Sequence, residues 1–199
     1  MHALEKILAK ASGKKEVRGG DIVTVKVDVA GINDLYLQVL HSFADIGRKQ
    51  VWDPSKVVFF FDHYAPAPTI KSAANQKVMR DFAAEQGIKN VFDINMGVCH
   101  QVLVEAGMSK PGSVIVITDS HSTTHGALGA LGTGVGATDL AAIMASGKTC
   151  MMVPEIMAIR LEGEIPPGVY AKDIILKALG DLGPSAAGYK AVEYIGETV

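Results

Sequence analysis

The sequence predicts an α/β protein in which a largely parallel sheet lies between two layers of helices, a three-layer α/β/α arrangement. Two short runs, residues 56–61 and 113–117, are almost wholly apolar, which is typical of strands that are buried on both faces of a parallel sheet. Stretches with apolar residues at helical spacing separate such runs, and this alternation indicates a parallel sheet. We treat residues 1–199 as a single domain, because no linker or repeat divides them.

The first half of the chain is predicted to contain three helices and two strands. Alternating valines predict a strand over 21–30 with one apolar and one mostly polar face. Apolar spacing predicts a helix over 33–47, with Asn33 or Asp34 as its N-cap. The other predicted elements are a helix at 2–11 that ends near Gly13, the strand at 56–61 and a helix at about 70–86.

The second half continues the alternation. A third strand is predicted within 87–94 and a fourth at 113–117, and a helix at 137–148 has Thr138 or Asp139 as N-cap and Gly147 as C-cap. The predicted elements after that helix are two short strands and a Pro-Pro-Gly loop within 151–173, a helix at 171–183 and a last strand at 189–199.

Composition excludes several classes of function. A net charge of −2 and an aromatic content of 6% argue against a nucleic-acid partner. No apolar run approaches the ~18 residues of a membrane span. The two cysteines, Cys99 and Cys150, form no CxxC pair, which favours a reducing, cytoplasmic location. The glycine-rich run 126–136 matches neither a dinucleotide fingerprint nor a P-loop.

Histidines follow three of the predicted strands. The strand at 56–61 ends in Asp62-His63, the strand near 90–94 leads to His100, and the strand at 113–117 leads to Asp119, Ser120 and His121. The carboxyl ends of parallel strands meet at one edge of a sheet, which is the usual edge for a ligand site. We therefore expect three imidazoles to converge on one crevice.

Structural explanations for these residues remain open at this point. Asp62 could form an Asx turn, His100 could be a hydrogen-bonded core histidine, and Asp119 could simply cap a helix beside a solvated His121. His125 could do no more than close its loop.

Several strings resemble the aconitase superfamily, in particular its branch of 3-isopropylmalate dehydratase large subunits, homoaconitases and dimethylmalate dehydratases. The string TDSHSTTHGALGALGTGVGATDLAA at 118–142 is the most specific. The others are DHYAPAP at 62–68, GVCHQVLVEAG at 97–107, VPE at 153–155 and AKDIIL at 171–176. Where members of that branch carry a His-Asp-x-Thr type string, this sequence reads Asn33-Asp34-Leu35-Tyr36.

The resemblance implies a hydro-lyase that acts on hydroxy polycarboxylates with a [4Fe-4S] cluster as Lewis acid. It implies that Asp62 and His63 protonate the departing hydroxyl, and that His100 and His121, the latter paired with Asp119, line the same cavity. The residues assigned to substrate binding are Gln38, Ser120, Thr124 and His125.

The resemblance also implies partners. The chain corresponds to the first domain of a large subunit, so the cluster cysteines are expected in other domains and a small subunit is expected to complete the enzyme. Two alternatives are a non-catalytic folding unit or binding module, and a mononuclear metal hydrolase with His63, His100 and His121, together with Asp119, as ligands.

Overall fold

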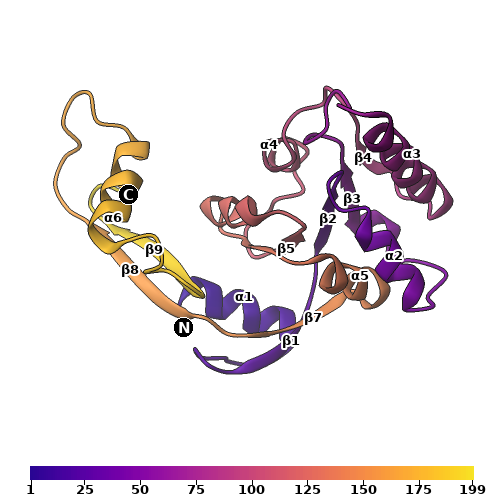
Figure 1. The fold of residues 1–199 in the computed structure, drawn as a ribbon. Coiled ribbons are helices and arrows are strands. Elements are labelled where there is room, and N and C mark those ends of the chain that lie inside the picture. The colour runs from indigo at the N-terminus through magenta and orange to yellow at the C-terminus, as the bar shows by residue number, and fades with distance from the viewer.

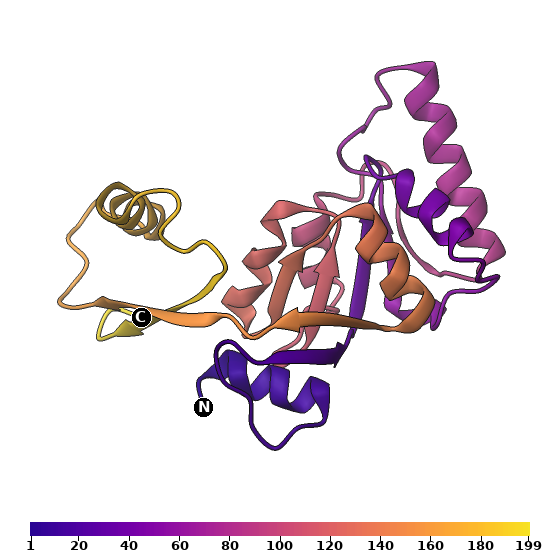
Figure 2. The same cartoon turned by 60° about the horizontal axis from the view of Figure 1, so that its bottom comes forward.

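A five-stranded parallel sheet forms the centre of the computed structural model, which describes all of residues 1–199 (Figures 1 and 2). The strands lie in the order β4–β3–β2–β5–β6, and every neighbouring pair is parallel. Their bounds are β2 Val29–Asn33, β3 Val57–Phe60, β4 Asn90–Phe92, β5 Val114–Ile117 and β6 Leu131–Gly134. The predicted α/β class with a parallel sheet is therefore confirmed.

Successive residues of each strand point to opposite sides of the sheet, so both faces carry side chains that need cover. Helices pack against each face. Ile32 and Phe59 belong to a core of 27 buried residues that also includes residues of α2 (Gln38–Asp45), α3 (Ile70–Glu85) and α5 (Ala137–Ser146). Phe60 and Ile117 belong to a second core of 8 buried residues on the other face, beneath α4 (Cys99–Glu105). The 3-10 helix η2 (Ser120–Leu128) packs beside α4 over β6. The predicted three layers are thus present.

The strand predicted over 21–30 is two strands in different sheets. β1 (Ile22–Lys26) pairs antiparallel with β7 (Lys148–Met152), and β2 begins at Val29 in the central sheet. The chain turns between them because Asp28 is anchored to β5: its carboxylate accepts a hydrogen bond from the backbone N–H of Val114 at 2.9 Å. The alternation expected from sequence persists in β1, where Val23 and Val25 are buried.

The helix predicted over 33–47 begins later than expected. Asn33 is the last residue of β2, and α2 starts at Gln38 with Leu37 as its N-cap, so neither Asn33 nor Asp34 caps a helix. The buried run that precedes Asn33 extends the strand, and Asn33 pairs with Phe60 of β3.

The remaining predicted elements are found close to their expected positions, but further elements are present and one cap differs. α4, η2 and β6 were not predicted, and α5 is capped by Gly136 rather than by Thr138 or Asp139, although Gly147 does end it. A 3-10 turn, η1 (Pro54–Lys56), precedes β3, and α1 spans Ala3–Ser12 with Gly13 as its C-cap. None of the helices has the length and apolar character that crossing a bilayer requires.

The last third of the chain forms a separate group of elements, which we call the β8–β9–α6 module (residues 155–196). β8 (Glu155–Leu161) and β9 (Lys190–Gly196) are parallel, and α6 (Ala171–Leu182) connects them. Figure 1 shows the module standing apart from the five-stranded sheet. Two of the contacts that tie it to the rest are the Glu193 carboxylate, which accepts hydrogen bonds at the start of α1, and the Tyr189 hydroxyl, which donates to the Met152 carbonyl.

Candidate functional site

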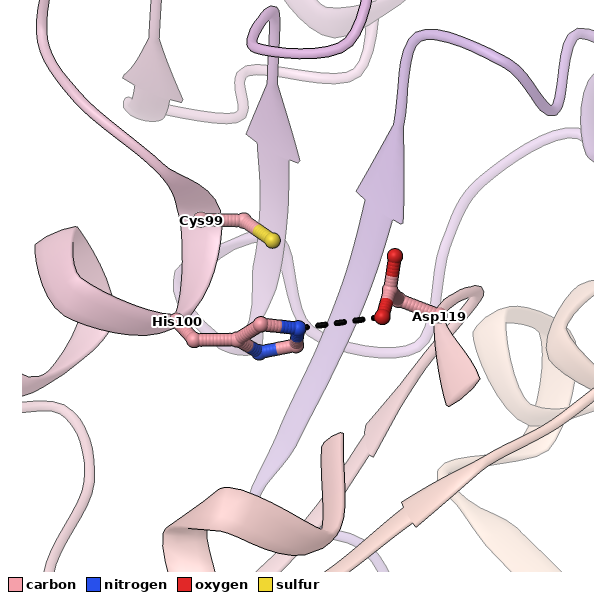
Figure 3. A group of neighbouring side chains, drawn as sticks. All are labelled: Cys99, His100 and Asp119. Carbon is pink, nitrogen blue, oxygen red and sulfur yellow. Dashed lines mark hydrogen bonds and ion pairs between the residues drawn. The ribbon is translucent and has the colours of Figure 1, made fainter. Parts of the chain in front are cut away.

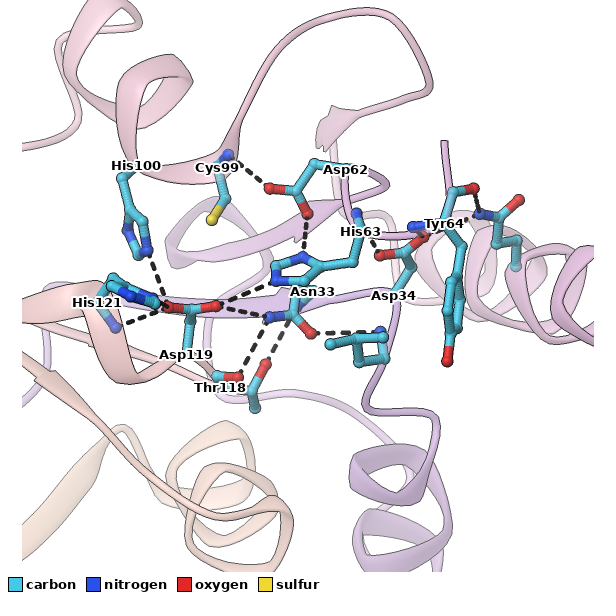
Figure 4. A network of polar contacts seen from close by, with 12 residues as sticks. Asn33, Asp34, Asp62, His63, Tyr64, Cys99, His100, Thr118, Asp119 and His121 are labelled. Carbon is cyan, nitrogen blue, oxygen red and sulfur yellow. Dashed lines mark hydrogen bonds and ion pairs between the residues drawn. The ribbon is translucent and has the colours of Figure 1, made fainter. Parts of the chain in front are cut away.

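Polar side chains gather at the carboxyl edge of the sheet, where β2 and β5 lie side by side. From β2 the chain builds outward through β3 and β4 in one direction, and through β5 and β6 in the other. A reversal of strand order of this kind leaves a crevice at the carboxyl ends, which is where ligands bind in open α/β sheets. The first residues beyond β2, β3 and β5 all contribute to the site (Figure 4).

The carboxylate of Asp119 is the centre of the site. Its Oδ1 lies 3.0 Å from His100 Nε2 and 3.2 Å from His121 Nδ1, and its Oδ2 lies 3.3 Å from His63 Nε2. We call these four residues the Asp119 cluster. The Asp119 side chain is only 10% exposed, so the three imidazoles surround a carboxylate that is largely removed from water. The three predicted strand exits therefore do converge.

His63 lies between two carboxylates. Its Nδ1 is 2.8 Å from Asp62 Oδ1, while its Nε2 faces Asp119. A carboxylate can only accept, so both ring nitrogens donate at once only when the ring is an imidazolium. The other oxygen of Asp62 accepts a hydrogen bond from the backbone N–H of Cys99 at 2.7 Å, which joins β3 to the start of α4.

Asn33 and Asp34 complete the network, so the helix cap predicted at these residues is wrong. The Asn33 side chain donates to the Thr118 carbonyl at 3.2 Å and to Asp119 Oδ2 at 3.4 Å. Asp34 accepts from the backbone N–H groups of His63 and Tyr64, both at 3.0 Å. A signal for them existed: a polar pair directly after a buried apolar run, as at the other strand exits.

The backbone of η2 fixes the position of Asp119. Asp119 is the N-cap of η2, and its carboxylate accepts a hydrogen bond from the His121 backbone N–H at 2.7 Å. η2 rests directly on β6, where a Cβ on Gly132 would clash with the Ser122 carbonyl oxygen and one on Gly134 with the Asp119 carbonyl oxygen. Glycine is therefore required at both positions of β6 for η2 to lie this close.

The surroundings shift the pKa of three groups at the site. Burial opposes ionisation of Asp119, but the His121 backbone N–H and the His100 ring outweigh it and hold the pKa of this carboxyl below its ordinary value. Burial, followed by the neighbouring Asp62 carboxylate, raises the pKa of the Cys99 thiol. Burial also lowers the pKa of His125, and the nearby His100 ring adds to this effect.

The cysteines of the chain do not fit an iron–sulfur cluster. Such a cluster is held by thiolates, but Cys99 is buried and its raised pKa keeps it a thiol, and Cys150 lies on β7 opposite Thr24 of β1. Figure 3 shows the Cys99 sulfur beside His100 and Asp119, where those two residues bond to each other. We therefore derive no catalytic step through a cluster bound by these residues.

The three-histidine metal site considered from sequence does not match the geometry. The ring nitrogens of His63, His100 and His121 each face an oxygen of Asp119. Two groups have ligand atoms within 4.8 Å of one another, Cys99–His100–Asp119 and Asp34–Asp62–His63, and neither contains the three histidines. In the second group, the Asp34 carboxylate already accepts hydrogen bonds from two backbone N–H groups.

The residues predicted to bind substrate lie in two environments. Gln38, Ser120 and Thr124 are exposed, and their side chains make no hydrogen bond within the chain, so their assignment to substrate binding stays a prediction. His125 is fully buried behind the Asp119 cluster and contacts Ser109, with 3.2 Å between Nδ1 and Oγ. Ser109 was not predicted, and no local pattern in the sequence points to it.

Comparison with known proteins gives a consistent result. The sequence profile of the aconitase family (aconitate hydratase) matches residues 5–199. The chain is 50% identical over 196 residues to the 3-isopropylmalate dehydratase large subunit 1 of Methanopyrus kandleri, covering 98% of this chain and 47% of that protein. It is 48% identical over 204 residues to a probable methanogen homoaconitase large subunit of Methanothermobacter thermautotrophicus, covering 100% of this chain and 48% of that protein. The chain thus spans about half the length of these curated relatives.

Proposed function

Because this chain belongs to the aconitase family, we propose that it forms the proton-transfer side of the active site of a hydro-lyase of the 3-isopropylmalate dehydratase or homoaconitase type. The observation that carries the proposal is the Asp119 cluster, in which three imidazoles from three strand exits surround one carboxylate. Three titratable rings gathered around a single acid are more typical of an acid–base site than of a purely structural one.

His63 is the residue best placed to donate a proton. Elimination of water from a hydroxy acid requires a proton for the departing hydroxide, and His63 combines a charge-stabilising pair of carboxylates with a side chain that is 32% exposed. Its contact with Asp119 is the longer of the two, 3.3 Å against 2.8 Å to Asp62. Release of Nε2 from Asp119 toward a substrate hydroxyl would leave the ring oriented by Asp62.

A polycarboxylate substrate suits the outer part of the site. The His121 side chain is 84% exposed while its Nδ1 stays 3.2 Å from Asp119, so its Nε2 is free to meet an anionic group. We propose that Ser120, Thr124 and Gln38 supply further hydrogen bonds to the substrate, since all three are exposed. The distinction between 3-isopropylmalate, homoaconitate, dimethylmalate and citrate rests on groups that contact the substrate's remaining substituent.

The proposal requires further polypeptide. We propose that a [4Fe-4S] cluster is held by cysteines outside these 199 residues, in the remaining domains of the large subunit, and that a small subunit closes the site. Residues 1–199 act as one domain of this assembly, which we place in the cytoplasm. The hollow lined by residues 47–52 and the one within the β8–β9–α6 module include no residue of the Asp119 cluster.

The test is a comparison of two histidine variants. The chain is tagged in its native host, purified anaerobically with the polypeptides that complete it, and assayed for hydration and dehydration of the candidate acids. His63→Asn is expected to lower kcat roughly 10²–10⁴-fold, the usual contribution of a positioned acid. His41→Asn is the matched control, since His41 is exposed on α2 and has no side-chain hydrogen bond. Equal activity of both variants would reject the role of His63.

A second candidate function is a binding module without turnover. It is favoured by the exposed apolar side chains next to site residues, such as Met96 at 56% and Val98 at 61% exposure, which a partner would cover. The same purification separates the two candidates. Tight binding of a hydroxy polycarboxylate without interconversion, in the presence of all co-purified polypeptides, would favour the binding module.

A further inference from the structure

Two buried side-chain nitrogen atoms have no hydrogen-bond partner, and they belong to neighbouring rings. They are Nδ1 of His100 and Nε2 of His125. The ring centroids are 5.5 Å apart and the rings are inclined at 65°. Buried polar atoms are nearly always hydrogen-bonded, and two exceptions in adjacent rings point to a shared partner.

The other nitrogen of each ring fixes which atoms carry protons. His100 Nε2 faces Asp119, whose carboxylate can only accept, so Nε2 carries a proton, and in the neutral ring the buried Nδ1 is then an acceptor. His125 faces the Ser109 hydroxyl through Nδ1 at 3.2 Å, and this hydroxyl makes no other side-chain hydrogen bond. If Ser109 donates to Nδ1, the proton of His125 lies on Nε2 and points away from Ser109.

A single water molecule between the rings would satisfy both unpaired atoms. Two hydrogen bonds of about 2.8 Å through one water span roughly 4.5 Å, which is within reach of two ring nitrogens whose ring centroids are 5.5 Å apart. The water accepts from His125 Nε2–H and donates to His100 Nδ1. The resulting chain of donors runs in one direction, from Ser109 through His125 and the water to His100, and ends on Asp119.

We propose that His125 is a positioning residue that, with Ser109 and one bridging water, holds His100 with its proton on Nε2 and directed at Asp119. This differs from the substrate-binding role expected for His125 from sequence, since the side chain is fully buried between α4 and η2. Burial lowers the pKa of His125, which favours the neutral ring that the array requires. The catalytic importance of the array rests on the proposed function, but the tautomers do not.

The first experiment measures the tautomers directly. Nitrogen-15 NMR of the histidine-labelled chain distinguishes protonated from unprotonated ring nitrogens and shows which ring protons exchange magnetisation with water. We expect both His100 and His125 to be protonated on Nε2 alone, with a water contact at His125 Nε2–H. A proton on Nδ1 of His125, or a charged His125 ring at neutral pH, would overturn the proposal whatever the enzyme's reaction is.

The second experiment uses side chains that place an amide donor at different points. The glutamine amide in His125→Gln reaches the position of Nε2, while the asparagine amide in His125→Asn reaches only that of Nδ1. In the completed enzyme we expect His125→Gln to keep kcat within about threefold, and His125→Asn and His125→Leu to lose about tenfold with little change in KM, a part of the full acid–base contribution.

Controls separate positioning from a folding defect. His41→Leu removes an exposed histidine and is expected to leave both tautomers and kcat unchanged. Ser109→Ala removes the donor to His125 and is expected to place part of the His125 protons on Nδ1. Indistinguishable kcat values for the glutamine, asparagine and leucine variants at position 125 would contradict the proposal. Loss of all turnover in the wild type would instead count against the proposed function, with the NMR result unaffected.

Discussion

The five-stranded sheet and the β8–β9–α6 module are built from the same unit, two parallel strands joined by a helix, yet only the sheet forms a core. Phe59 of the sheet and Leu140 of α5, which packs on it, are completely buried, because helices cover both faces of the sheet. In the module, no residue of α6 is buried, and Leu176 and Leu179 are 54% and 47% exposed. A parallel sheet needs cover on both faces to bury its strands, and two strands with one helix provide cover on one.

The sheet and the module differ in burial, and this difference suits them to different roles within one chain. The Asp119 cluster stands on the carboxyl edge of the five-stranded sheet, where packed neighbours fix its geometry. The module presents exposed apolar side chains, which mark a surface for contact with further polypeptide. If this division holds, substitutions in the sheet change catalysis and stability, and substitutions in the module change contacts with other polypeptides.

The largest expected effect is on catalysis and is confined to the sheet. Asp119→Asn removes the charge that the three imidazoles share, and is expected to lower kcat of the completed enzyme roughly 10²–10⁴-fold. Asp181→Asn in the module removes an exposed carboxylate that is paired only with Lys177, and is expected to leave kcat unchanged. Comparable losses of kcat in steady-state assays of the two variants would show that catalysis does not depend on the sheet more than on the module.

The next effect is on stability. Phe59→Ala opens a cavity in the larger core and is expected to lower the free energy of unfolding by about 3–5 kcal/mol. Leu179→Ala truncates a half-exposed side chain of α6 and is expected to cost less than about 1 kcal/mol. Urea denaturation followed by circular dichroism measures both values. A loss in Leu179→Ala as large as that in Phe59→Ala would show that α6 is as well packed as the sheet.

A smaller effect is expected in the pH dependence of stability. The pKa of Asp119 is lowered in the folded protein from an ordinary value of 3.8. Its ionised form therefore stabilises the fold at pH values above the unfolded-state pKa, and this contribution is lost as the pH falls through the folded-state pKa. The wild type is expected to exceed Asp119→Asn by about 1–3 kcal/mol at neutral pH, with the difference closing below about pH 4. A difference that persists unchanged at pH 2 would mean that packing, not charge, causes it.

The smallest effect concerns the attachment of the module. Glu193→Gln replaces a carboxylate with a neutral amide. That carboxylate accepts hydrogen bonds from His2 and from the backbone N–H of Ala3, and both contacts are exposed. We expect a loss of about 0.5 kcal/mol or less in global stability. Hydrogen exchange is the more sensitive measurement, and faster exchange is expected at the start of α1 and along β9, with β2 and β5 unchanged. Equal acceleration throughout the sheet would imply that the two regions open together.

Sequence reasoning succeeded where local pattern and tertiary structure agree. The apolar runs that became β3 and β5 and the polar residues after them are read from the chain directly, and the convergence of His63, His100 and His121 follows from the parallel order of the strands. β6 was missed because its sequence, Leu-Gly-Thr-Gly, has little strand propensity. Its place is set by pairing with β5 and by the η2 backbone above it.

Two further misses have a common physical cause. Asn and Asp favour helix caps and strand exits alike, so Asn33 and Asp34 were assigned to the helix whose apolar spacing follows them. Ser109 meets His125 across 16 residues and two different elements, and no periodicity records such a contact. Interactions that depend on where two segments meet in space cannot be predicted from the sequence of either segment alone.

The glycines of β6 have one more consequence. η2 is seated on Gly132 and Gly134 through main-chain atoms, so its exposed side chains that make no hydrogen bond can differ without disturbing this contact. Thr123 and Thr124 are exposed on that same segment, beside the histidine that reaches toward solvent. Under the proposed function, a substitution at these two threonines changes the surface offered to a substrate without disturbing the main-chain contacts that hold Asp119.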